Sequence, residues 1–390
     1  MANITQYIKD YGDISFVDKP FNDADNIALC GMYYMPLEKA VSDSFDDKPI
    51  PYKQVSDKVF ELRGFKHTPV GLVLLKNISE QMVEMAKYKR YAEMKVVACT
   101  RVYQKEPAVQ FEAATFLLPD KTIVVLFKGT DDTLTGWKED LDILTQKSIP
   151  SNKYSTEYLE KVADKFDGDI IICGHSKGGF IAQYAAMYCS DKVKARIKCF
   201  YNNDGPGFWD YEYLNSSEYA QMFPKYKHFV PQSSFIGMLL AHDYDYTVVK
   251  SDKILGPLQH DLASWQIKGD QLEIAEELTP MGKINDLVFK ELVENLTPEQ
   301  EKVLDKVVGT VVNGVEQEGL LDVAGNIGET IKKGKAALDS VDKETKKEFL
   351  KIFKPVPKIV YTKQRDVQTE VYRSINENIK DTLKYINVLF

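Results

Sequence analysis

A serine between two glycines directly follows an apolar run, and this combination constrains the fold more than any other feature. Residues 170–173 are apolar, and Gly174-His175-Ser176-Lys177-Gly178 comes next. A helix rich in small residues is predicted after it, over 180–186. Strand, glycine-flanked serine and helix are the setting of a nucleophile elbow, whose strained turn leaves no room for side chains beside the serine. The segment predicts a nucleophile at Ser176; an ordinary glycine-rich turn is the alternative.

Apolar runs alternate with helical patterns through the middle of the chain. Strands are predicted at 96–99, 109–118, 122–127, 170–173 and 197–201, with a last pair at 225–230 and 246–250. A further helix is predicted around 156–166. The run 122–127 is apolar without alternation, which is typical of a strand buried on both faces. The order predicts an α/β fold with a central, mostly parallel sheet flanked by helices.

Both ends of the chain have a helical pattern. Residues 1–90 are predicted to be mainly helical and packed on the sheet, with Asn22 capping a helix and a second helical pattern at 79–91. The pattern is all-helical from 269, and Thr297-Pro298-Glu299-Gln300 has the form of a capping box. We therefore expect an α/β-hydrolase domain at 1–268 and a helical C-terminal region at 269–390, which is a candidate cap over the active site.

Composition narrows the functional classes. The formal net charge is −8, which argues against a nucleic-acid partner for the whole chain. Five cysteines without CxxC spacing indicate reduced, mostly buried thiols rather than a disulfide framework. The first residues lack the pattern of a signal peptide, and no run of eighteen apolar residues occurs. These features predict a cytoplasmic protein and leave its oligomeric state open.

A loop after an earlier buried strand could supply an oxyanion hole. A serine nucleophile that cleaves acyl groups needs N–H donors fixed in advance around the tetrahedral intermediate. One donor would be the backbone N–H of Lys177, and the other that of Thr130, whose hydroxyl would be an auxiliary donor. A simple turn role is the alternative for Thr130. Asp131 and Asp132 beside it are interpreted as solvated loop charges, so we expect neither a metal nor another cofactor.

The base and the acid follow from the order of residues on such a fold, which is serine, then acid, then histidine. His260 lies in a loop after the last predicted strand and is the predicted base, with His242 as the alternative. Asp204 follows the predicted strand at 197–201 and is the predicted acid. Asp243 and Asp245 are the other acids that the sequence leaves open, and a turn role is the alternative for Asp204.

The motifs around these residues resemble those of class 3 lipases. Phe127-Lys128-Gly129-Thr130, followed by Trp137 and Asp140-Leu141, resembles their F-R-G-T/S…W…D-L signature, and Gly174 to Gly179 resembles their G-H-S-L-G-G elbow. A bacterial branch of these lipases is more similar, because its G-H-S-K-G-G, D-G-P-G-F and Q-H-D…S-W motifs all occur here. Its second and third motifs stand at Asp204 to Phe208 and at Gln259 to Trp265.

This resemblance covers roughly residues 15 to 270 and implies a lipase-like α/β-hydrolase fold and a reaction class. Class 3 lipases usually carry their acid one strand after Asp204, where this chain reads Val230-Pro231-Gln232-Ser233-Ser234. Some α/β-hydrolases place the acid one strand earlier, and Asp204 fits that position.

The expected function is that of a serine hydrolase of the lipase/esterase type, which cleaves a small-molecule or lipid ester through an acyl-enzyme on Ser176. Acyl transfer to another acceptor would use the same residues. A lipid-binding or partner-binding protein on a degenerate hydrolase scaffold is a different reading, supported by the missing carboxylate after residue 230.

A basic segment lies near the C-terminus. Residues 343–365 contain eight lysine and arginine residues against Glu344 and Glu348, a formal charge of +6. Apolar residues are interleaved, so peripheral contact with an anionic membrane is one interpretation. Packing of an apolar face on the hydrolase domain, under a solvated basic face, is the other.

Overall fold

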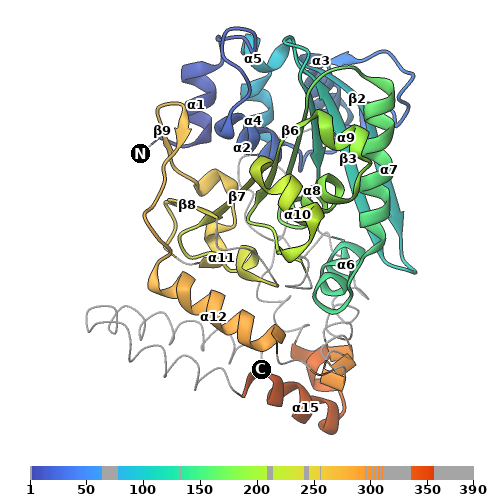
Figure 1. Ribbon diagram of the computed structural model, residues 1–390, viewed down its shortest axis with the longest axis vertical. Coiled ribbons are helices and arrows are strands. Elements are labelled where there is room, and N and C mark those ends of the chain that lie inside the picture. Colours follow the sequence, from blue (N-terminus) through green and yellow to red (C-terminus); the bar gives the residue numbers. More distant parts are fainter. Residues whose placement is uncertain are drawn as a thin grey trace.

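An eight-stranded sheet forms the centre of the computed structural model (Figure 1). The structure describes residues 2–63, 78–131, 133–208, 214–240, 246–254 and 256–294, then 297, 299–300, 302–303, 306–307, 310 and 335–354. The strands lie side by side in chain order: β1 (Ile50–Pro51), β2 (Lys95–Gln104), β3 (Val109–Leu117), β4 (Ile123–Phe127), β5 (Ile170–His175), β6 (Ile197–Asn203), β7 (Tyr226–Pro231) and β8 (Thr247–Val249).

The sheet changes direction at β4. Strands β1 to β4 pair antiparallel, whereas β4 to β8 are parallel throughout. Parallel neighbours need crossover connections, and helices supply them between β4 and β7. This arrangement confirms the predicted α/β fold with a mostly parallel central sheet flanked by helices.

Alternate residues of the central strands enter two separate hydrophobic cores. One core takes Val124, Leu126 and Ile171, together with the N-terminal helices. The other takes Val125, Phe127 and Ile172, together with helices α7 (Pro150–Lys165) and α8 (Lys177–Tyr188). Figure 1 shows these two groups of helices on opposite sides of the sheet. Burial on both faces explains why β4 and β5 are apolar without alternation.

Five helices precede β2 within the described residues: α1 (Ile4–Tyr11), α2 (Asp23–Met32), α3 (Tyr52–Arg63), α4 (Ile78–Met85) and α5 (Lys89–Ala92). The predicted cap at Asn22 is confirmed as a capping box with Asp25. One detail differs from the prediction, because the pattern at 79–91 is divided between α4 and α5 by a turn at 86–88.

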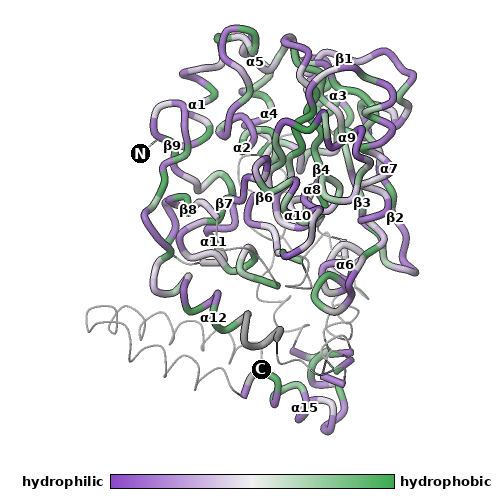
Figure 2. Tube along the Cα trace, viewed as in Figure 1, coloured by the Kyte–Doolittle hydropathy of each residue, from purple (hydrophilic) through white to green (hydrophobic). Residues whose placement is uncertain are grey.

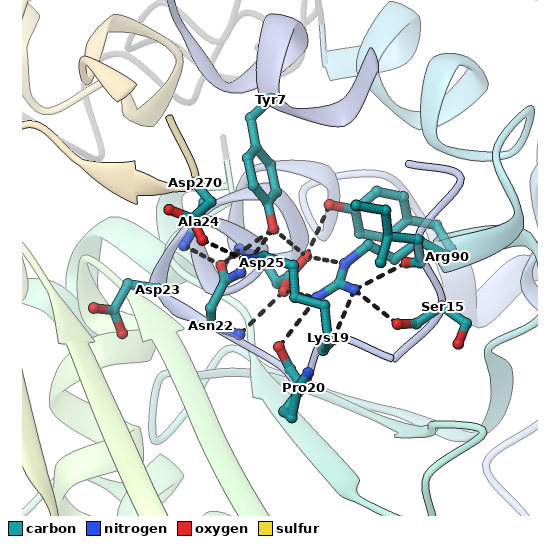
Figure 3. Close-up of polar contacts among 12 residues, drawn as sticks. Tyr7, Ser15, Lys19, Pro20, Asn22, Asp23, Ala24, Asp25, Arg90 and Asp270 are labelled. Carbon is teal, nitrogen blue, oxygen red and sulfur yellow. Dashed lines mark hydrogen bonds and ion pairs between the residues drawn. The ribbon is translucent and has the colours of Figure 1, made fainter. Parts of the chain in front are cut away.

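A buried ion pair fixes these helices to one another (Figure 3). Arg90 and Asp25 are fully buried, and Arg90 Nε lies 2.8 Å from Asp25 Oδ1. The Tyr7 and Tyr91 hydroxyls donate to the same carboxylate oxygen, at 3.2 and 2.9 Å. Arg90 Nη2 also donates to Asp25 Oδ2, and further guanidinium hydrogens go to main-chain carbonyl oxygens, including those of Ile14, Lys19 and Pro20. The dense hydrogen bonding offsets the cost of burying both charges and joins α1, α2 and α5.

Two other elements are longer than the sequence predicts. Helix α7 begins at Pro150 instead of near residue 156, because proline occupies its first position without losing a needed hydrogen bond. Strand β2 continues to Gln104, past a register shift between Val97 and Thr100. Its outer half pairs with β3 beyond the covered part of the sheet and lacks the apolar run that indicates a strand.

The helical C-terminal region is described in part. Helix α12 (Pro280–Glu294) and helix α15 (Lys343–Phe353) lie there, and the capping box is confirmed by hydrogen bonds exchanged between Thr297 and Gln300. The hairpin of β9 (Ile267–Lys268) and β10 (Gln271–Leu272) spans the predicted boundary at 268/269. That boundary and the cap stay predictions.

Helix α15 carries the first half of the basic segment. Figure 2 shows hydrophobic and hydrophilic residues alternating along it. Phe349 and Ile352 are buried, and Phe349 packs in a small cluster with Val307 and Val341, outside the two cores of the sheet. Phe349 is therefore covered within the C-terminal region, whereas Leu350 of the same helix is exposed. Membrane contact by the exposed basic side stays a prediction, and residues 355–365 lie outside the described ones. Within the described part of the chain, no helix has the length and apolarity needed to cross a membrane.

Candidate active site

Ser176 occupies the turn between β5 and α8. Its backbone has φ 58° and ψ −131°, a conformation that residues other than glycine rarely adopt. A side chain at Gly174 would overlap the main-chain oxygen of Gly178, and one at Gly178 would overlap that of Phe127. Both glycines are thus required by the close approach of elbow, helix and β4. The turn holds Ser176 half-buried at the carboxyl edge of the sheet.

Asp204 follows the neighbouring strand at the same level. His175 on β5 pairs with Asn203 on β6, so Ser176 and Asp204 leave adjacent parallel strands together. The Ser176 N–H donates to the Asn203 carbonyl oxygen at 3.0 Å. Asp204 also has a positive φ, of 49°, and its N–H donates to the Phe229 carbonyl oxygen on β7. The predicted nucleophile and acid therefore lie in adjacent turns at one sheet edge.

His260 joins them through its contact with Asp204. His260 Nδ1 lies 2.7 Å from Asp204 Oδ2, and the carboxylate is almost fully buried whereas 13% of the His260 side chain is exposed. A carboxylate only accepts hydrogen bonds, so Nδ1 carries the proton and Nε2 has a free lone pair when the ring is neutral. That is the tautomer a general base requires.

The predicted motif around His260 forms a rigid support for it. Gln259, the last residue of α11 (Gly256–Gln259), accepts from the Ser233 N–H and donates to the Lys253 carbonyl oxygen, both at 2.7 Å. Its own carbonyl oxygen accepts from the indole of Trp265 at 2.9 Å. Asp261 accepts from the Ala263 N–H, and burial raises the pKa of the Asp261 carboxyl to about 6. These contacts fix the loop on both sides of His260.

The loop after β7 lacks a carboxylate but contacts one. Ser234 Oγ donates to Asp204 Oδ1 at 2.5 Å, and the Gly237 N–H donates to the same oxygen at 3.1 Å. The place where class 3 lipases usually carry the acid thus supplies hydrogen-bond donors to the acid of the preceding strand. The alternatives His242, Asp243 and Asp245 lie outside the described residues.

Thr130 lies in the loop that follows β4, and the hydrogen-bond partner of its hydroxyl differs from the prediction. Thr130 Oγ donates to the Asp140 carboxylate, with both carboxylate oxygens at 2.7 Å. A hydroxyl has one hydrogen, so in this arrangement it cannot serve as the expected auxiliary donor to an oxyanion. Burial raises the pKa of the Asp140 carboxyl to about 6. The backbone N–H groups of Thr130 and Lys177 stay the predicted donors.

The Lys177 side chain has a partner that the sequence did not indicate. Its ammonium is fully buried, 3.0 Å from Glu139 Oε2, and donates to the main-chain oxygen and Oε1 of Gln110 at 2.8 and 2.6 Å. Glu139, on α6 (Leu134–Thr145), accepts in turn from Gln110 and Ser151. All three ammonium hydrogens are satisfied, which offsets the desolvation of a charge next to the nucleophile.

A second missed group lies on the other side of the elbow. The Tyr34 hydroxyl lies 2.8 Å from His175 Nδ1, and His175 Nε2 lies 2.9 Å from the His260 main-chain oxygen. Burial lowers the pKa of His175 well below its ordinary range. Nothing in the sequence singled out Tyr34, since it is an ordinary aromatic residue at the end of a helical pattern.

Cysteine and metal chemistry find no support in the described residues. None of the five cysteines forms a disulfide, and all but Cys199 are buried. No group of three or more histidine, cysteine, aspartate or glutamate side chains in the described ranges could hold a metal ion. Asp132, one of the two loop carboxylates considered from the sequence, lies outside those ranges.

Comparison with known families gives a match over more than half of the chain. A family model described as Mbeg1-like matches residues 85–308, and that family is reported as lipase-like. The matched span includes the strands from β2 to β8 and all the predicted site residues, from Thr130 to His260. No curated protein shows significant similarity to the chain.

Proposed function

The chain belongs to the Mbeg1-like family, and we propose that it is a serine hydrolase of the lipase/esterase type that cleaves a carboxylic ester through an acyl-enzyme on Ser176. The lipase-like family and the α/β sheet support the general class. The observation that carries the specific proposal is the 2.7 Å contact between His260 and Asp204 at the edge where Ser176 occupies a strained turn. This chemistry requires a nucleophile, a base that takes its proton and an acid that orients the base, and on this fold they follow in the chain order serine, acid, histidine.

The proposed reaction begins with transfer of the Ser176 hydroxyl proton to His260 Nε2 as Ser176 Oγ attacks the ester carbonyl carbon. The carbonyl oxygen becomes an oxyanion, which accepts hydrogen bonds from the backbone N–H groups of Thr130 and Lys177. Collapse breaks the bond to the alcohol, which takes its proton from His260. Water then repeats the sequence on the acyl-enzyme and releases the acid. An alcohol or amine in place of water would give acyl transfer with the same residues.

Asp204 would stabilise the His260 imidazolium and hold its tautomer. The hydrogen bonds from Ser234 and Gly237 both go to Asp204 Oδ1, which fixes the carboxylate with Oδ2 free to accept from His260 Nδ1. These bonds also bear on the alternative of a degenerate binding scaffold. That reading was based on the missing carboxylate after β7, and the loop there instead supports the carboxylate of Asp204.

The proposal is tested with a panel of p-nitrophenyl esters graded by acyl length. Wild type should turn over at least one ester, and Ser176→Ala should abolish that turnover. Ser216→Ala is the matched control, because Ser216 also precedes a helix, α10 (Ser217–Met222), outside the proposed site. The acyl length of the ester with the highest kcat/KM indicates the substrate class, from short esters to lipids. Well-folded wild type that hydrolyses none of the panel would favour the binding scaffold.

A further inference from the structure

The main chain of the proposed base is held by a residue pair that the reaction itself does not use. His175 Nε2 lies 2.9 Å from the His260 carbonyl oxygen, and the two imidazole rings are 4.4 Å apart between centroids. On the opposite side of its ring, His175 Nδ1 lies 2.8 Å from the Tyr34 hydroxyl. His175 precedes Ser176 directly, so this contact ties the elbow to the loop that carries His260.

The partners of His175 determine its tautomer. A carbonyl oxygen only accepts hydrogen bonds, so Nε2 must carry a hydrogen to bond with His260. The buried ring is neutral at neutral pH, since burial lowers its pKa well below the ordinary range. Nδ1 therefore has no hydrogen and accepts one from the Tyr34 hydroxyl. The His260 carbonyl oxygen thus selects the tautomer, and the Tyr34 hydroxyl supplies the hydrogen-bond donor that the buried Nδ1 needs in that form.

Tyr34 also contacts the proposed oxyanion loop. A side chain at Gly129 would overlap the Tyr34 hydroxyl and would lie 2.8 Å from the His175 main-chain oxygen. The tyrosine is buried and follows α2, in the part of the chain before the residues that the family model matches. Through the Tyr34 side chain, the N-terminal part of the chain contacts both the loop before Thr130 and His175, which in turn bonds to the His260 main chain.

We propose that Tyr34 and His175 are positioning residues for His260: the Tyr34 hydroxyl satisfies His175 Nδ1 and holds the ring in place, and His175 Nε2–H holds the His260 main chain. This inference rests on the proposed function, because it assigns His260 as the base. Neither residue is catalytic, since neither is assigned contact with the reacting atoms. The N-terminal helical part is then a component of the active site, in addition to its packing on the sheet.

The test compares Tyr34→Phe with Tyr52→Phe on the best p-nitrophenyl ester. Tyr52 is a matched control, because it is a buried tyrosine of the N-terminal part whose hydroxyl donates to the main-chain oxygen of Met82 at 3.2 Å. Tyr34→Phe should lower kcat by about tenfold with KM within about twofold, since misplacement of the base affects the transition state more than binding. Tyr52→Phe should leave kcat within about twofold.

A double-mutant cycle separates positioning from packing. In His175→Gln, the side-chain amide can donate to the His260 carbonyl oxygen without a tautomer to select. This variant should therefore retain more activity than His175→Leu, and adding Tyr34→Phe to it should change kcat by less than about twofold. An equal loss in both backgrounds would show that Tyr34 acts by packing and would overturn the proposal, as would an unchanged kcat in Tyr34→Phe.

An NMR measurement that does not depend on turnover distinguishes failure of this inference from failure of the proposed function. In protein labelled with ¹⁵N-histidine, the His175 signal, assigned by its loss in His175→Gln, should report a single Nε2–H tautomer. Tyr34→Phe should shift the His175 Nδ1 signal, because that nitrogen loses its hydrogen-bond donor, whereas Tyr52→Phe should leave this signal in place. A wild type that hydrolyses no ester would contradict the proposed function while this spectrum still tests the tautomer. An Nδ1–H tautomer in wild type would overturn the inference even if the enzyme is active.

Discussion

Asp204 Oδ2 lies 2.7 Å from His260 Nδ1, although the two residues are 56 positions apart in the chain and only the fold brings them together. This contact supports the proposed role of Asp204, in the turn after β6, as the acid. Asp204→Asn keeps the shape of the side chain but removes its charge and lets the ring adopt the wrong tautomer. We expect kcat to fall by about a thousandfold or more, with little change in KM or in the thermal unfolding midpoint. Activity like that of wild type would move the role to Asp243 or Asp245.

Ser234 should matter for turnover through Asp204. Ser234→Ala removes the shorter of the two hydrogen bonds to Asp204 Oδ1 and leaves that from Gly237. We expect kcat to fall by about tenfold, equal to roughly 1.4 kcal/mol of transition-state stabilisation. Ser233→Ala is the matched control, because the Ser233 hydroxyl contacts Thr279 instead of the acid. Equal kcat values for the two variants would show that the Ser234 contact has no role in turnover.

Removing one charge from the buried pair of Lys177 and Glu139 should destabilise the folded protein strongly. Lys177→Met leaves Glu139 buried without its cation, and we expect a loss of about 3 to 5 kcal/mol in the free energy of unfolding. The double variant Lys177→Met/Glu139→Gln should recover part of that loss, because no unpaired charge remains. Denaturant unfolding measures both changes.

An exposed ion pair of similar geometry provides the comparison for that measurement. Lys192 and Asp164 are 3.0 Å apart with about 70% of each side chain exposed. Lys192→Met should change the free energy of unfolding by less than about 1 kcal/mol. Similar losses for Lys192→Met and Lys177→Met would contradict the account of the buried pair.

Asp140 predicts a specific dependence of stability on pH. Burial raises the pKa of its carboxyl from 3.8 to about 6 in the folded protein, so the folded state binds this proton more tightly than the unfolded state. Stability from this group is present at low pH and is lost as the pH rises through that range. Asp140→Asn stays neutral, so its unfolding free energy should improve relative to wild type between about pH 4 and pH 7. A difference that is constant with pH would contradict the raised pKa.

The features predicted correctly from the sequence are those whose signal is local. Apolar runs identify β4 and β5 because both faces of these strands are buried, and the glycine pattern identifies the elbow because close backbone contacts exclude side chains there. His260 and Asp204 followed from residue order on an assumed fold. Their contact required the three-dimensional structure, since either of two histidines and any of three aspartates satisfied that order.

The features that the sequence did not predict depend on contacts between distant, ordinary residues. Glu139 and Gln110 become partners of Lys177 only when α6 and β3 pack beside the elbow, and Tyr34 reaches His175 from the N-terminal helices. No local periodicity marks a buried ion pair or a tyrosine that supports a histidine. The contact of the Thr130 hydroxyl also differs from the prediction, because α6 turns Asp140, ten residues further along the chain, towards Thr130.

The central claim is that Ser176 is an activated nucleophile, and covalent labelling by a fluorophosphonate followed by peptide mapping tests it most directly. Labelling requires the serine to attack phosphorus, with proton transfer to the base, and it needs no knowledge of the substrate. We predict one adduct per chain, on the peptide that contains Ser176, with labelling lost in Ser176→Ala and strongly slowed in His260→Ala. A folded wild-type protein that takes up no label, or that is labelled at another residue, would contradict the account.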